Sequence, residues 1–129
     1  MDLEIFCFCD GAFNYGGKLT IVGTYDQLRL ETVPQNVKVA IALKLNIPRA
    51  ELREGSKLVL SFIDSRDNQI AGNIDYNIVG IPEEAKVIHI ALASSVDFNI
   101  TTFGLHSAVL SLDGKVLKVK EFEIVQVQN

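Results

Sequence analysis

The clearest local signal in the chain is an alternation of apolar and polar residues on both sides of an Asp-Gly pair. Residues 103–112 and 115–127 are rich in β-formers, and Asp113-Gly114 lies between them. Both central positions of a type I′ turn need positive φ, which Asp-Gly adopts readily, so the pattern predicts a β-hairpin. One face of the first arm consists of Ala108, Leu110 and Leu112. Because an isolated hairpin is marginal in water, we expect further strands to cover this face.

The same period-two alternation recurs along the rest of the chain. It predicts strands at residues 3–9, 18–31, 37–45, 57–64, 69–79 and 86–94. The phase of the alternation changes across Gly23, which predicts a β-bulge or a bend there, and again near Lys120-Glu121, which predicts a second β-bulge. Residues 48–55 hold helix formers between a proline and a glycine and predict one helical turn. We interpret the glycine-rich residues 11–17 as a loop.

Seven or eight short strands without a long helix indicate an all-β protein. Turn signals at regular spacing are typical of an antiparallel β-sandwich of the immunoglobulin-like or jelly-roll type. The 129 residues contain no repeat or low-complexity linker. Residues 1–129 are therefore expected to form a single β-sandwich domain.

Composition and charge narrow the classes of function. The chain is 48% hydrophobic and 22% charged, which is typical of a globular protein. Its net charge of −4 disfavours nucleic-acid binding. The acidic start Met-Asp-Leu-Glu is unlike a signal peptide, and Lys44 interrupts the longest apolar stretch, so we expect no membrane span and a cytoplasmic location.

Two cysteines lie two residues apart in the first predicted strand. Side chains at this spacing point the same way and are too far apart for easy disulfide geometry. We therefore expect Cys7 and Cys9 to be buried, reduced thiols. Zinc ligation is the alternative, but no other Cys or His pair has suitable spacing, and we predict no cofactor and no metal.

The histidines and acids show no obvious catalytic set. His89 falls on the outer face of its strand, and His106 is expected to be half-buried with a ring nitrogen bonded to a loop carbonyl. Asp64 and its turn could offer oxygens to calcium but match no known loop pattern. An enzyme that pairs His106 with Asp97 or Asp10 is the least favoured hypothesis, and the chain is predicted not to be an enzyme.

Several short motifs carry a family resemblance. They are Cys9-Asp10, Gly17-Lys18-Leu19 with Ile21 and Gly23, Asp26, Pro34, and Gly104 ahead of Leu112-Asp113-Gly114. In this order they resemble a family of small bacterial all-β proteins that is known only as a domain of unknown function. The resemblance covers nearly the whole chain and implies a sandwich-like fold, but it implies no activity. His106 departs from the pattern, since an aromatic residue is more usual there.

The favoured hypothesis is a non-enzymatic binding or assembly module. The apolar content is high for a small domain, which suggests that a partner or a second copy covers some hydrophobic surface. The alternative is a small-ligand or carbohydrate-binding domain that uses the loops at one end of the sandwich. The scattered tyrosines give little sign of a platform for stacking sugars.

Phe6 and Phe8 are the candidate interaction surface. The first strand is apolar on both faces, with Leu3, Ile5, Cys7 and Cys9 on one face and these two rings on the other. If their face is uncovered, a homodimer is the simplest way to bury them. The rival explanation is that the loop at residues 11–17 covers both rings.

Overall fold

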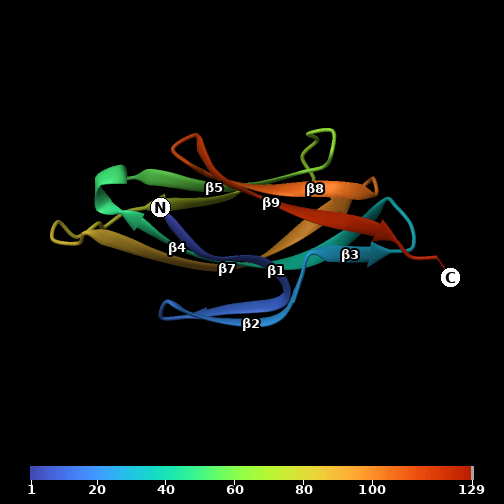
Figure 1. The fold of residues 1–129 in the computed structure, drawn as a ribbon, viewed down its shortest axis with the longest axis horizontal. Helices are drawn as coiled ribbons and strands as arrows, with labels where there is room; N and C mark the ends of the chain where they lie inside the picture. Colours follow the sequence, from blue (N-terminus) through green and yellow to red (C-terminus); the bar gives the residue numbers. More distant parts are fainter. Residues whose placement is uncertain (129) are drawn as a thin grey trace.

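Residues 1–128, which the computed structural model describes, form nine strands and one short 3-10 helix (Figure 1). The elements are β1 (Asp2–Tyr15), β2 (Lys18–Tyr25), β3 (Gln27–Leu30), β4 (Gln35–Pro48), η1 (Arg49–Glu51), β5 (Ser56–Ile63), β6 (Ile74–Ile78), β7 (Val87–Ile100), β8 (Gly104–Leu112) and β9 (Lys115–Gln126). Within these residues no helix is long and apolar enough to span a bilayer.

The strands form two sheets. One has four strands in the order β2-β1-β4-β7, and the other has five in the order β3-β9-β8-β5-β6. The predicted all-β class is confirmed. The predicted count of seven or eight strands is wrong, and the pairing is not wholly antiparallel, because β3 runs parallel to β9. The sequence pattern misses the count because residues 18–31, which alternate almost continuously, divide between the two sheets.

The Asp-Gly hairpin is confirmed as the β8–β9 connection. Asp113 and Gly114 have φ of 49° and 83°, so both central residues adopt the positive φ of a type I′ turn. A register shift occurs in this hairpin, between Leu110 and Ser111. The bulge predicted at Lys120-Glu121 is therefore misplaced by a few residues, since the extra residue of β9 lies nearer the turn.

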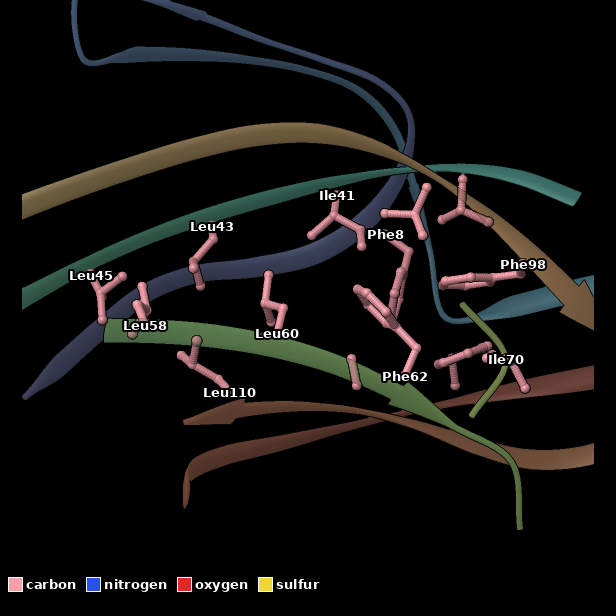
Figure 2. Packing of buried hydrophobic residues seen from close by; sticks show 14 of the residues in the cluster. Phe8, Ile41, Leu43, Leu45, Leu58, Leu60, Phe62, Ile70, Phe98 and Leu110 are labelled. Atoms are coloured by element: carbon pink, nitrogen blue, oxygen red, sulfur yellow. The ribbon is translucent and has the colours of Figure 1, made fainter. Parts of the chain in front are cut away.

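The core lies between the two sheets and draws side chains from both (Figure 2). Strand β4 contributes every second residue, from Val37 to Ile47, and β5 and β8 oppose it with Leu58, Leu60 and Leu110. Four phenylalanines close one end of this layer. Their ring centroids lie 4.6 to 6.3 Å apart, and they are Phe8, Phe62, Phe98 and Phe122.

Strand β1 overturns the expectation for Phe6 and Phe8. A register shift between Leu3 and Ile5 reverses the alternation, so Phe6 pairs with Leu43 and both rings point toward the core. Phe8 is 1% exposed, and Phe6 is half-buried against the core. The pair cannot form the exposed contact surface that the sequence suggested, because one extra residue moves each following side chain to the other face.

Residues 11–17 do not form a covering loop. Strand β1 continues to Tyr15, the chain turns at Gly16-Gly17, and β2 returns as the second arm of a hairpin. Near the base of this hairpin Gly23 has φ of 67°, and a Cβ there would collide with the carboxylate of Asp10. Glycine is thus required here, but β1 and β2 pair on both sides of it in one register, so no β-bulge occurs at Gly23.

The β1–β2 hairpin folds back beneath the four-stranded sheet, on the side away from the core (Figure 1). Asn14 Nδ2 donates a hydrogen bond of 2.9 Å to the carbonyl of Ala91 in β7. Beneath the hairpin, Cys9 and Ala42 are 0% exposed although both point away from the core. Small side chains on the outer face allow the hairpin to lie close to the sheet.

Core truncations are expected to dominate stability. Leu60→Ala and Leu110→Ala should each lower the free energy of unfolding by about 2–5 kcal/mol, through lost apolar transfer and a cavity. Urea unfolding monitored by circular dichroism measures this change. Val116→Ala, at an outer position that is 55% exposed, is the control and should stay within about 0.5 kcal/mol of wild type. Unchanged urea midpoints for both leucine variants would contradict a shared core at these positions.

Candidate functional site

The central part of the outer face of the five-stranded sheet is uncharged over three neighbouring strands. In this part the side chains that alternate with the core positions are valine, isoleucine and serine. We name this surface the valine–serine face; it comprises Val59, Ser61, Ile63, Ser107, Val109, Ser111, Val116 and Val119. Each of these side chains is half-buried or exposed in the chain by itself.

Large and small side chains alternate between β5 and β8 on the valine–serine face, as well as along each of these two strands. Val59 lies beside Ser111, and Ser61 lies beside Val109. Ile63 likewise lies beside Ser107, so each branched side chain on β5 neighbours a serine on β8. On such a face, protruding aliphatic side chains alternate with shallow gaps of similar size. Side chains of two packed sheets interdigitate on surfaces of this shape.

The two outer faces of the molecule differ in how they are covered. The β1–β2 hairpin covers the middle of the outer face of the four-stranded sheet, where Cys9 and Ala42 are 0% exposed. Within residues 1–128 no element covers the valine–serine face, where Val116 is 55% and Val119 is 47% exposed. The sheet therefore presents a largely apolar surface on a hydrogen-bonded support.

Charged residues border this surface. Lys57 forms an ion pair of 3.3 Å with Asp75 at one margin, and Glu121 and Glu123 of β9 lie at the other. An apolar centre with a charged border is the arrangement found in many protein interfaces.

A hollow of about 450 Å³ lies beyond Glu121 and Glu123, where β2 and β3 meet β8 and β9. Its polar lining includes Arg29 and Tyr25. Burial, and then the nearby Asp10 carboxylate, raises the pKa of Tyr25 to about 12, so the phenol stays neutral at physiological pH. The hollow is shallow and open to solvent, and its neutral phenol offers a hydrogen bond rather than a nucleophile.

A second exposed apolar feature lies on the hairpin. Phe13 and Tyr15 are 48% and 68% exposed on the side of the hairpin that points away from the sheet. Their rings are nearly parallel, with centroids 6.3 Å apart and an interplanar angle of 22°. The glycines at residues 11–17 indicate a loop, so the sequence does not predict this pair; the i,i+2 spacing of the two aromatics is the signal that points to it.

The carboxylate of Asp64 stabilises a turn by accepting backbone hydrogen bonds, so its Oδ1 atom is already engaged. Its Oδ1 atom accepts hydrogen bonds of 2.9 Å from the backbone N–H groups of Arg66 and Asn68. These bonds, with that of Asn68 first, hold the pKa of the Asp64 carboxyl below its usual value. Within residues 1–128 no group of three His, Cys, Asp or Glu side chains is placed to hold a metal ion.

His106 makes the bond that was predicted, but it is fully buried and not half-buried. Its Nδ1 atom lies 2.9 Å from the carbonyl oxygen of Gly104, which requires that Nδ1 carries the proton. The side chain is 1% exposed, and Nε2 has no hydrogen-bond partner in the described chain. The structure does not bring His106 together with Asp97 or Asp10, because His106 points into the core whereas both acids are exposed on the other sheet.

The two cysteines are free thiols in different surroundings. Cys9 is buried and directs its sulfur at the carbonyl of Ala40, whereas Cys7 is half-buried. Burial raises the pKa of both thiols above the usual value, so little thiolate is present near neutral pH. The predicted burial is thus confirmed for Cys9 and is partial for Cys7.

The lowered pKa of Asp64 predicts a loss of stability in acid. A carboxyl whose pKa is lower in the folded state stabilises the protein above its unfolded pKa of about 3.9, and the stabilisation disappears as the pH falls through the folded value. Asp64→Asn should therefore be less stable than wild type at pH 7, and the difference should shrink below pH 4. Urea midpoints measured from pH 7 to pH 2.5 test this; a constant difference across the range would contradict the assigned role.

The raised thiol pKa values predict slow alkylation. In the folded protein at pH 7.5, iodoacetamide should leave Cys9 unmodified and should modify Cys7 slowly. In 6 M urea both thiols should react at the rate of a free cysteine. Intact mass measured over time tests this, and rapid modification of Cys9 in the native protein would contradict its burial under the hairpin.

The comparison with protein families found one match that spans nearly the whole chain. The model of a family of unknown function, DUF6941, matches residues 4–125. Those residues include both sheets, the valine–serine face and the hairpin. The comparison with curated proteins returned no match. The resemblance noted in the sequence is thereby confirmed at the level of the family, and the chain belongs to the DUF6941 family.

Proposed function

We propose that this chain is a non-enzymatic binding or assembly module that docks another protein on the valine–serine face. The observation that carries the proposal is the contrast between the two outer faces. One is covered over its middle by the chain's own hairpin, while the other leaves adjacent apolar side chains in solvent. Contiguous apolar patches on soluble proteins commonly mark interaction sites.

The positions of the titratable groups support a structural role for them. Asp64 is engaged with backbone amides, and His106 is engaged with the Gly104 carbonyl. Asp113 likewise accepts hydrogen bonds from the Lys57 amide and the Ser56 hydroxyl. Each of these groups holds a turn or strand end in place, which suits a scaffold for binding.

The finer aspects of the fold belong to the same proposal. Two sheets that share one core, with helical or extended crossovers between them, suit a single-domain β-sandwich of immunoglobulin-like or jelly-roll type. Two free thiols suit a reducing compartment, and we place the protein in the cytoplasm.

A second candidate function is supported by the aromatic pair on the hairpin. Near-parallel exposed rings at Phe13 and Tyr15 could stack on the face of a sugar ring. This would make the chain a small-ligand or carbohydrate-binding domain. The pair lies on the hairpin and not on the valine–serine face, so the two functions can be separated by mutation.

Charge placed on the valine–serine face should weaken binding of the protein partner while the fold is kept. Val116→Lys combined with Val119→Lys alters two exposed positions, and Val79→Lys, at a residue 68% exposed outside this face, is the matched control. Affinity capture from the native cells would first identify proteins retained by wild type. With the purified partner, the double variant should bind at least about tenfold more weakly than wild type. The free-energy cost of removing water from a lysine charge exceeds the free energy that burial of a valine contributes. The control variant should bind as wild type does.

The hairpin variant decides between the two candidates. Phe13→Ala combined with Tyr15→Ala should leave binding of the protein partner unchanged. If instead this variant alone loses binding, or if wild type binds a glycan array in a manner that depends on Tyr15, the second function is favoured and the first is rejected.

A further inference from the structure

Strand β7 ends the four-stranded sheet with an unusually long and regular edge. It has 14 residues, and its pairing with β4 runs from Val87 to Ile100 without a register shift. Residues 87–96 include no charged residue, no proline and no glycine. Natural sheet edges are commonly protected by just those residues, or by bulges and short length.

The other edges of the two sheets carry such protection. The open part of β1 has Glu4 and a register shift, and β2 has Gly23 at positive φ. Strands β3 and β6 have only four and five residues. The open part of β9 has a register shift and carries Lys115, Lys118 and Lys120.

Two hydrogen bonds show which peptide groups of β7 face away from β4. The N–H of Asn99 donates to the carbonyl of Ile70 at 2.8 Å, and the carbonyl of Ala91 accepts from Asn14. Peptide groups alternate in direction along a strand, so those of Ala93, Ser95 and Asp97 point the same way. Within residues 1–128 these three have no hydrogen-bond partner on that side.

An open row of peptide donors and acceptors is satisfied best by another strand. The core-facing side chains of β7 also favour a second strand here, because Leu92 is only half-buried where β7 borders solvent. A hollow of about 230 Å³ beside Ala91, lined also by Gly17 and Tyr76, leaves room at this end. The outward side chains along this part of the edge are small or short, namely Ala91, Ala93 and Ser95, which favours close approach of a second strand.

We propose that β7 pairs with β7 of a second copy, antiparallel and about a two-fold axis at Ala93, to join two four-stranded sheets into one. The register follows from pairing the acid of this edge, Asp97, with its histidine, His89, whose Nδ1 bonds Asn46 Oδ1 within the chain. With Ala93 opposite its own copy, His89 lies opposite Asp97 of the partner subunit, and the axis repeats the contact. The only charged side chain of the edge thus meets an imidazole twice, and a shift of the axis by one residue loses both contacts.

The same register determines which other residues of the two β7 strands lie opposite each other. Ala91 lies opposite Ser95 of the partner subunit, and their backbone groups exchange hydrogen bonds. On the inner side Ile90 lies opposite Val96 of the partner subunit, and Leu92 is covered. The Asn14 side chain of the β1–β2 hairpin, which donates to the Ala91 carbonyl in the single chain, would share this carbonyl with the incoming strand or release it.

Ser95→Pro tests the pairing through the backbone. The N–H of Ser95 points away from β4, so proline removes a donor that the isolated chain does not use, while Ser95→Ala keeps it and serves as the control. Sedimentation equilibrium of wild type should show a dimer at high micromolar concentration. Ser95→Pro should weaken the dimer by about ten- to hundredfold, because two symmetry-related hydrogen bonds are lost, and Ser95→Ala should not change it.

A charge swap tests the register independently of proline. His89→Asp alone should dissociate the dimer, because two aspartates would then face each other at each end of the axis. Adding Asp97→His should restore it. Circular dichroism and urea midpoints establish that each variant is folded, so a misfolded Ser95→Pro leaves the charge swap to decide.

Amide hydrogen exchange provides a direct readout. In concentrated wild type the amides of Ala93, Ser95 and Asp97 should be protected, and dilution below the dissociation constant should remove the protection. A wild type that stays monomeric at high micromolar concentration overturns the proposal, as does a dimer unaffected by Ser95→Pro and by His89→Asp. Neither result bears on the valine–serine face, which belongs to the other sheet.

Discussion

The contact between the phenylalanines of the two sheets is the interaction on which the rest of the structure depends. Phe8 and Phe98 come from the four-stranded sheet, and Phe62 and Phe122 come from the five-stranded sheet. The ring of Phe8 lies 4.6 Å from that of Phe122, at the point where β1 stops pairing with β4 and starts pairing with β2. Burial of this ring holds the base of the β1–β2 hairpin in the core while the rest of it turns outward.

The direction of that hairpin decides which surfaces the protein leaves open. Because it folds over the four-stranded sheet, it buries Cys9 and Ala42 and brings Asn14 to the carbonyl of Ala91. The five-stranded sheet has no such cover in the described chain, and its outer side chains stay in solvent. The asymmetry between the faces connects the fold to the proposed binding function.

Backbone hydrogen bonding provides the second connection between fold and association. A sheet that does not close has edges, and this molecule protects most of them with lysines, bulges or short strands. Strand β7 lacks these features over residues 87–96. The face and the edge lie on different sheets, so a chain could pair with its own copy and still bind a different protein.

The sequence by itself determined the local structure. Alternation along each strand identified the core side chains of β4, β5 and β8, and Asp113-Gly114 located the central hairpin, because side-chain period and turn chemistry depend only on neighbouring residues. The tertiary structure alone decided which face of β1 is inward, since one bulge at Glu4 turns Phe8 into the core. It also decided that Gly11 to Gly17 extend a hairpin, and which outer face that hairpin covers. These outcomes depend on contacts between residues far apart in the chain, which a pattern of nearest neighbours does not contain.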